Sequence, residues 1–167
     1  MAGPLDMIII TGLSGSGKSF AIRALEDNGF FCIDNIPALL IPKVIDLSHG
    51  HEEEIRRIAL GVDLRGGQFL QALPAVLSEM RDAGHRVQIL FFDAADEVLL
   101  RRFSETRRPH PLAGQGSIQE GISRERKALE PIRALADKII DTSDFNVHQL
   151  KREMEQQFCE IAQPRRM

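Results

Sequence analysis

Residues 7–19 read Met-Ile-Ile-Ile-Thr-Gly-Leu-Ser-Gly-Ser-Gly-Lys-Ser, a short apolar run followed by a glycine-rich loop. The loop matches the pattern G-x-x-x-x-G-K-[ST], and a segment with helical periodicity follows it. Small residues let backbone amides converge on phosphate oxygens, while Lys18 supplies a charge for the β- and γ-phosphates and Ser19 a hydroxyl for Mg²⁺. The alternative is a chance glycine-rich turn. We expect the whole loop to bind ATP or GTP with Mg²⁺, through Gly12, Leu13, Ser14, Gly15, Ser16, Gly17, Lys18 and Ser19.

Short apolar runs alternate with longer amphipathic segments along the chain. Continuous apolar character is typical of strands buried on both faces of a parallel sheet. The order predicts an α/β, three-layer P-loop NTPase domain with a mostly parallel five-stranded sheet. The expected strands are residues Met7–Thr11, Phe30–Ile33, Ile58–Val62, Val87–Phe92 and Lys138–Ile140.

Several helix ends carry recognisable signals. A first helix is expected from Lys18 to about Asn28, with Gly29 able to take the left-handed conformation that ends it. Ser117–Glu120 fits a capping box at the start of a helix that contains Pro131. In the last helix, Asn146 is a candidate cap if Phe145 packs onto Leu150. Pro37, Pro42 and Pro74 leave the starts of the second and third helices open.

Three aspartates end apolar runs, and each has a functional and a structural interpretation. Asp63 best fits the carboxylate that holds Mg²⁺ or its water shell. The alternative for Asp63 is an aspartate that ends a strand and is solvated. Asp34 would lie at the rim of the second strand and orient an acceptor or a water; the alternative is an Asx turn against Pro37. For Asp93, which precedes acidic residues at a helix start, the structural interpretation is favoured.

Arginines gather just before a Pro/Gly-rich stretch. A helix followed by arginines and a flexible segment is typical of a lid that closes over phosphates, so residues about 104–117 are expected to form a kinase-like, mobile lid. Arg107 and Arg108 of this lid are candidate catalytic residues. Lys18 and Asp34, outside the lid, are the other two candidates. The alternative is an amphipathic helix with solvated arginines, which is expected to cover Arg101 or Arg102.

The composition limits the remaining possibilities. The chain has 167 residues, 43% of them hydrophobic and 27% charged, which fits one globular domain over residues 1–167 and excludes disorder. Its net charge of −3 provides no overall positive field for nucleic acid or an anionic membrane. Two cysteines form no disulfide framework, and no stretch predicts a membrane span or a signal peptide. The expected location is the cytoplasm, without membrane partners.

Five segments together resemble the RapZ family of bacterial P-loop nucleotide-binding proteins, which includes an RNase adapter protein. The most specific are Gly-Phe-Phe-Cys-Ile-Asp-Asn-Ile-Pro ending at Pro37 and Ser-Glu-Thr-Arg-Arg-Pro-His-Pro-Leu over Ser104–Leu112. The others are Gly12–Ser19, Asp63–Arg65 and Ile140–Ser143.

The resemblance implies a kinase-like P-loop fold that binds and hydrolyses ATP and GTP. It also implies a second, GTP-associated motif at Asp63, Leu64, Arg65 and Gly66, where Leu64 and Gly66 depart from the family's usual residues. Family members continue into a further domain, so the chain resembles their N-terminal half. RNA or ribonuclease partners are implied for the full-length member and are not transferred to this chain; the oligomeric state is left open.

Three functions remain in competition. The leading hypothesis is a regulatory domain that binds nucleotide and hydrolyses it slowly, because no glutamine or glutamate is evident as a base for the attacking water. The first alternative is a small-molecule or nucleotide kinase. The second is an RNA-interaction module in which the nucleotide is structural.

Overall fold

A single parallel sheet organises the chain, whose computed structural model describes residues 5–48, 57–62, 67–106 and 117–162. Among those residues five strands pair in the order β2-β3-β1-β4-β5, and every pairing is parallel. The central strand β1 therefore leads from the middle of the sheet into the glycine-rich loop. The strands are β1 (Asp6–Gly12), β2 (Phe31–Ile36), β3 (Arg57–Val62), β4 (Arg86–Asp93) and β5 (Lys138–Asp141).

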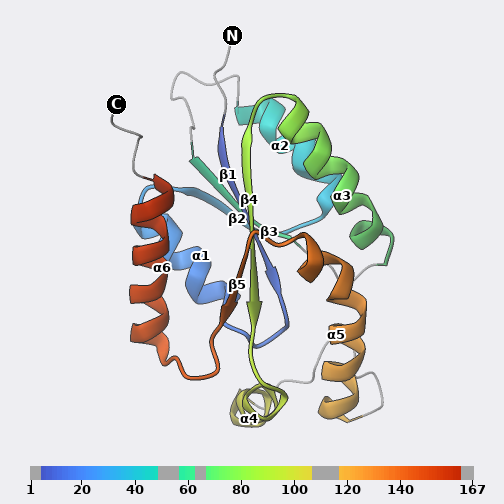
Figure 1. The fold of residues 1–167 in the computed structure, drawn as a ribbon, viewed down its shortest axis with the longest axis vertical. Coiled ribbons are helices and arrows are strands. Elements are labelled where there is room, and N and C mark those ends of the chain that lie inside the picture. The colour runs from blue at the N-terminus through green and yellow to red at the C-terminus, as the bar shows by residue number, and fades with distance from the viewer. Residues whose placement is uncertain (1–4, 49–56, 63–66, 107–116, 163–167) are drawn as a thin grey trace.

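Helices cover both faces of this sheet. Figure 1 shows α1 and α6 on one side and α2, α3 and α5 on the other, with α4 near the carboxyl ends of the central strands. The helices are α1 (Lys18–Asp27), α2 (Ile41–Ser48), α3 (Gly67–Asp82), α4 (Asp96–Thr106), α5 (Ile118–Leu135) and α6 (Val147–Ala162), with a short 3₁₀ turn, η1 (Ala38–Leu40). The expected three-layer α/β class is confirmed.

Alternate residues of β1 feed two separate hydrophobic clusters. Met7 and Ile9 pack in the cluster under α2, α3 and α5, whereas Ile8 and Ile10 pack under α1 and α6. All four side chains are at most 1% exposed. Burial of such a side chain contributes about 1.5–3 kcal/mol, so this strand is fixed in place on both faces.

The expected strands are all present, and the second is longer than predicted. It continues through a bulge between Ile33 and Ile36, where Asn35 has a φ of 56°. Asparagine tolerates this left-handed conformation better than most residues. The polar pair Asp34-Asn35 therefore bends the strand without ending it.

The predicted helix ends are also confirmed. Gly29 has a φ of 88°, and the Phe30 amide donates to the Leu25 carbonyl, which closes α1 with a left-handed cap. The Glu120 amide donates to Ser117 Oγ at 3.2 Å, as a capping box requires. Asn146 and Gln149 exchange side-chain-to-amide hydrogen bonds of 2.8 and 2.9 Å at the start of α6.

Of the prolines that left the helix starts open, Pro37 is the N-cap of η1, whereas Pro42 and Pro74 lie inside helices. Pro42 lies in the first turn of α2, where a missing amide proton costs little, while Pro74 and Pro131 lie within α3 and α5. Within the described residues, no helix has the length and apolar character needed to cross a membrane.

Candidate phosphate-binding site

The glycine-rich loop begins where β1 meets β4. Gly12 has a φ of 137°, and a Cβ atom there would lie 2.1 Å from the Phe92 carbonyl oxygen. The next amide, Leu13 N–H, donates to that same oxygen at 3.1 Å. Only glycine allows the two strands to approach so closely. The packing of β4 therefore requires glycine at the first position of the loop.

Two further glycines turn the loop toward α1. Gly15 and Gly17 have φ values of 83° and 105°, and Gly17 is the N-cap of α1 without a side-chain hydrogen bond. The amides of the first helical turn are thus directed into the loop without a capping side chain. Amide protons and the positive helix end together favour an anion at this position.

Lys18 folds back over the start of the loop. Its Nζ donates to the Gly12 carbonyl at 2.9 Å, and the side chain is half-buried. The ammonium group therefore lies beside the end of the loop that follows β1. Ser19, the next residue, is exposed in the first turn of α1.

One side of the loop is held by α4 and by the end of β5. Thr142 is 1% exposed, and its Oγ1 donates to the Ser16 carbonyl at 2.6 Å. Arg102 Nη1 donates to the Gly15 carbonyl at 2.9 Å, and its Nη2 donates to the Thr142 carbonyl at 2.7 Å. Arg101 is exposed, as expected of a solvated arginine, but Arg102 is half-buried and fixes the loop.

The other side of the loop is held by a buried acid from α5. Glu125 is 7% exposed, and its Oε1 accepts from the Ser14 amide at 2.7 Å while its Oε2 accepts from Ser14 Oγ at 2.6 Å. Sequence reasoning missed this residue. A signal did exist, because Glu125 falls at helical spacing between the apolar residues Ile122 and Leu129, on the face that faces the core.

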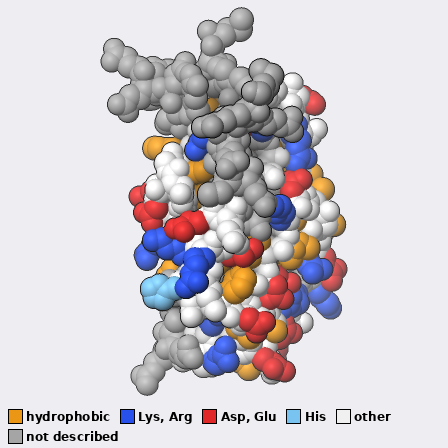
Figure 2. Space-filling view, turned by 60° about the vertical axis from the view of Figure 1, so that its left-hand side comes forward, with side chains coloured by type: hydrophobic (Ala, Val, Ile, Leu, Met, Phe, Trp, Pro, Cys, Tyr) orange, Lys and Arg blue, Asp and Glu red, His pale blue; other side chains and the backbone are white. Residues whose placement is uncertain are grey.

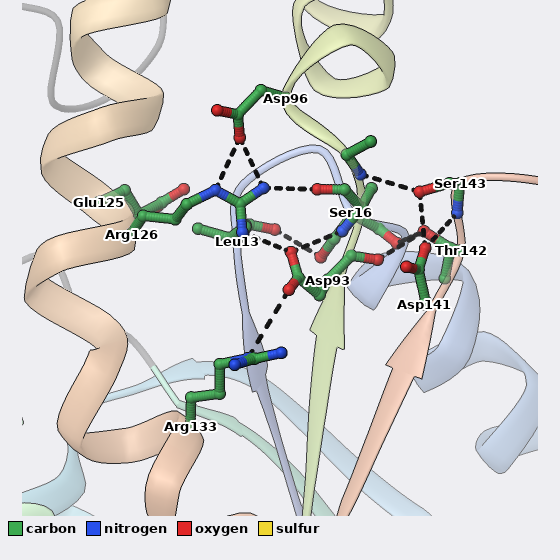
Figure 3. Close-up of polar contacts among 12 residues, drawn as sticks. Leu13, Ser16, Asp93, Asp96, Glu125, Arg126, Arg133, Asp141, Thr142 and Ser143 are labelled. Carbon is green, nitrogen blue, oxygen red and sulfur yellow. Dashed lines mark hydrogen bonds and ion pairs between the residues drawn. The ribbon is translucent and has the colours of Figure 1, made fainter.

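Asp93, at the end of β4, belongs to an ion-pair network. Figure 3 shows its carboxylate between two arginines of α5: Arg126 Nη1 lies 2.9 Å from Oδ1 and Arg133 Nε lies 3.7 Å from Oδ2. Arg126 also donates to Asp96 and to the Ala94 carbonyl, both at 2.6 Å. Burial disfavours the charged guanidinium, but the hydrogen bonds to Asp96 and Asp93 outweigh it and raise the pKa of Arg126. These contacts favour the structural interpretation of Asp93, whose carboxylate pairs with both arginines and accepts from the Ala94 amide at 2.8 Å.

Asp34 lies over β3 on the α1 face of the sheet. A Cβ atom at Gly61 would come within 2.6 Å of Asp34 Oδ1 and 2.9 Å of the Ile22 side chain, which belongs to α1. Its carboxylate accepts from the Asn35 amide at 2.8 Å and is exposed. The described contacts of Asp34 are thus with Asn35 and beside Gly61 of β3. They do not form the Asx turn against Pro37 that was the alternative interpretation.

Six of the predicted site residues fall outside the part of the chain that the structure describes. These are Asp63, Leu64, Arg65 and Gly66 of the second motif and the arginines Arg107 and Arg108. Within the described residues, no group of three His, Cys, Asp or Glu side chains is placed to hold a metal ion. On the face drawn in Figure 2, the described basic and acidic side chains lie interspersed, without a field of one sign.

Known structures with this architecture include small-molecule kinases. Shikimate kinase from Bacteroides thetaiotaomicron superposes with a TM-score of 0.57 at 14% identity, over 94% of this chain and 98% of the kinase. A gluconokinase from Sinorhizobium meliloti 1021 gives 0.55 at 16% identity, over 97% and 95% of the two chains. At such low identity the similarity concerns the fold, which is that of the P-loop kinases.

Sequence relatives are much closer. A "Nucleotide-binding protein" of Myxococcus xanthus is 59% identical over 92% of this chain and 53% of the relative. Another, from Geobacter metallireducens, is 54% identical over 88% of this chain and 52% of the relative. The chain thus spans about half the length of these curated relatives. The model of the RapZ-like N-terminal domain matches residues 5–161, and the chain belongs to that family.

Proposed function

We propose that this chain binds a nucleoside triphosphate, ATP or GTP, with Mg²⁺ in the loop Gly12–Ser19, and that it hydrolyses the nucleotide slowly as a regulatory domain. The observation that carries the proposal is the geometry of the loop. Three glycines with positive φ lead from the central strand into an uncapped helix start, and Lys18 lies over the loop. The curated relatives named as nucleotide-binding proteins support it.

The chemistry follows from the charges on a polyphosphate. Loop amides and the N-terminal end of α1 bind phosphate oxygens, and the Lys18 ammonium leaves the Gly12 carbonyl to bind the β- and γ-phosphates. In hydrolysis a water oxygen bonds to the γ-phosphorus as the bond to the β-phosphate oxygen breaks. One proton of the attacking water passes to the solvent, and the negative charge moves to the departing diphosphate. Lys18 stabilises that charge where it develops.

The donor set suits magnesium, which prefers oxygen ligands. Ser19 has an exposed hydroxyl in the first turn of α1, and Asp63 directly follows the last residue of β3, the strand beside β1. We propose that Ser19 and Asp63 hold the ion or its water shell. When bound, the ion neutralises phosphate charge.

Two further segments complete the proposal. Asp63, Leu64, Arg65 and Gly66 form the GTP-associated motif, and Arg107 and Arg108 stabilise the transition state from a lid. If these arginines act mainly in the transition state, replacing both with alanine lowers kcat more than it raises KM. Equal effects on both constants would contradict that role.

A direct test is calorimetry with Mg-ATP and Mg-GTP on the protein and on Lys18→Ala. Removing the ammonium group is expected to weaken triphosphate binding by about 10- to 100-fold, because charge-assisted hydrogen bonds are worth about 1.5–3 kcal/mol. Lys43→Ala, at an exposed position of α2, is the matched control and keeps the original affinity. No heat with either nucleotide for a folded protein would refute the proposal.

A second candidate function is a small-molecule or nucleotide kinase, and the position of Asp34 favours it. Its exposed carboxylate lies across Gly61 on the α1 face, where it can accept the proton of an acceptor hydroxyl. That hydroxyl oxygen would bond to the γ-phosphorus while the bond to the diphosphate breaks. Labelled ATP incubated with a panel of small metabolites distinguishes the two functions. Fast transfer to any acceptor would replace the regulatory proposal, and release of inorganic phosphate alone would support it.

RNA or ribonuclease partners, and the role of an RNase adapter, are proposed for full-length members of the family only. Nothing in the described residues of this chain adds support for them.

A further inference from the structure

The Glu125 carboxylate occupies hydrogen-bond donors of the phosphate loop itself. Both of its oxygens accept from Ser14, one from the amide at 2.7 Å and one from Oγ at 2.6 Å. The side chain is 7% exposed, so these bonds form away from bulk water, where a bond to a charged group is strongest. The role proposed above for the loop does not use this residue.

The position of Lys18 shows which end of the loop Glu125 flanks. In loops of this pattern the lysine binds the β- and γ-phosphates, the terminal part of the nucleotide. Here its ammonium lies 2.9 Å from the Gly12 carbonyl, two residues before Ser14. When Lys18 leaves the Gly12 carbonyl for the β- and γ-phosphates, as proposed above, these phosphates lie within reach of its side chain. Ser14 and Glu125 then border the part of the loop that the terminal phosphate approaches.

The helix that carries Glu125 is held in place by the next residue. Arg126 binds Asp93 at 2.9 Å and the Ala94 carbonyl at 2.6 Å, which fixes α5 to the end of β4 (Figure 3). Moving the whole helix away would break these bonds. Glu125 can leave Ser14 without that movement, by rotating its own side chain.

We propose that Glu125 is a specificity-determining residue that disfavours nucleoside triphosphates relative to diphosphates in this loop. The inference rests on the proposed nucleotide site. A γ-phosphate competes with the carboxylate for Ser14 and brings a second negative charge beside it, whereas a diphosphate ends before this position. Retention of the diphosphate product then limits turnover.

Calorimetric titration of Glu125→Gln with Mg-ATP and Mg-ADP tests the proposal. Glutamine keeps the shape and the ability to accept from the Ser14 amide, but it removes the charge. We expect the ratio of triphosphate to diphosphate Kd to fall by about tenfold, mainly through tighter triphosphate binding. Glu130→Gln, at an exposed position of the same helix, is the matched control and keeps the original ratio.

Three results would overturn the inference, and they are distinguishable. An unchanged ratio in Glu125→Gln, with both nucleotides still bound, contradicts the role in discrimination alone. Loss of turnover at saturating ATP with an unchanged ratio would identify Glu125 as a base for the attacking water. Absence of binding by the unaltered protein would refute the nucleotide site, and this inference with it.

Hydrogen exchange of the Ser14 amide provides a readout apart from affinity. In protein without nucleotide, Glu125→Ala is expected to speed exchange at Ser14 by about tenfold or more, because the amide loses its acceptor. Glu125→Gln, which retains an acceptor, is expected to exchange at nearly the original rate. Equal exchange in the unaltered protein and in Glu125→Ala would overturn the contact on which the inference depends.

Discussion

Two carboxylates that follow apolar runs, Asp93 at the end of β4 and Asp34 within β2, show how a similar sequence context leads to different roles. Each follows an apolar run, but Asp93 is 13% exposed and bound by arginines of α5, whereas Asp34 is exposed and lies over a glycine. The difference arises from the elements packed nearby. Helix α5 brings Arg126 and Arg133 to the end of β4, and Gly61 leaves room beside β2. A charged residue that follows an apolar run is therefore structural or available for chemistry according to its neighbours in space.

The largest effect is expected where the network at Asp93 is broken. Arg126→Ala removes hydrogen bonds to two carboxylates and leaves Asp93 with the more distant Arg133. Because Arg126 is only 33% exposed, we expect the free energy of unfolding to fall by about 2–3 kcal/mol. Urea denaturation measures the change, and Arg101→Ala, at an exposed position of α4, is the control. A loss no larger than that of the control would show that Asp93 does not need Arg126.

A smaller loss of stability is expected from a substitution at Gly61, beside Asp34. Gly61→Ala places a Cβ atom 2.6 Å from Asp34 Oδ1 and 2.9 Å from the Ile22 side chain. Both are ends of side chains that can move, so we expect a loss of about 1 kcal/mol in the free energy of unfolding. In an Asp34→Ala background the same substitution should cost less, since one of the two close contacts is gone. Equal costs in both backgrounds would contradict the packing of Asp34 on Gly61.

Replacement of the exposed carboxylate itself should change stability least. Asp34→Asn is expected to alter the free energy of unfolding by less than about 0.5 kcal/mol, because the side chain is exposed and still accepts a hydrogen bond. If Asp34 takes part in phosphoryl transfer, kcat falls while the urea midpoint is unchanged. If Asp34→Asn lost as much stability as Arg126→Ala, the predicted difference between Asp34 and Asp93 would be wrong.

A third carboxylate after an apolar run, Asp141 at the end of β5, extends the comparison to pH. Hydrogen bonds from the Ser143 side chain and amide lower the pKa of Asp141. A lowered folded-state pKa gives stability that is present above the unfolded value of about 3.9 and is lost as pH falls through the folded value. The urea midpoints of the protein and of Asp141→Asn should therefore differ at pH 7 and converge below about pH 4. A difference that is constant with pH would exclude this linkage.

Local patterns predicted most of the fold. Apolar runs located all five strands, and the caps at Gly29, Ser117 and Asn146 follow from side chains within a few residues of each other. The bulge at Asn35 was not predicted, because it depends on how β2 pairs with β3. The position of the loop Gly12–Ser19 between β1 and α1 was predicted for the same local reason.

The supports of the loop were not predicted, because they come from distant parts of the chain. Glu125 is 111 residues from Ser14, and Thr142 is 126 residues from Ser16. The sequence did not distinguish Arg101 from Arg102 as the solvated arginine, and only the fold shows that Arg102 donates to the Gly15 carbonyl. Helical spacing marks Glu125 as facing inward, yet only the packing of α5 beside the loop shows what it faces.

These two supports have a consequence for the order in which the protein becomes competent during synthesis. The strand and loop emerge from the ribosome first, and Glu125 and Thr142 follow 111 and 126 residues after their partners Ser14 and Ser16. Until then Ser14 and Ser16 lack the side chains that hold them. A nascent chain that ends before α5 would carry the complete loop sequence without these contacts, so the loop should take its folded shape late, together with α5 and β5.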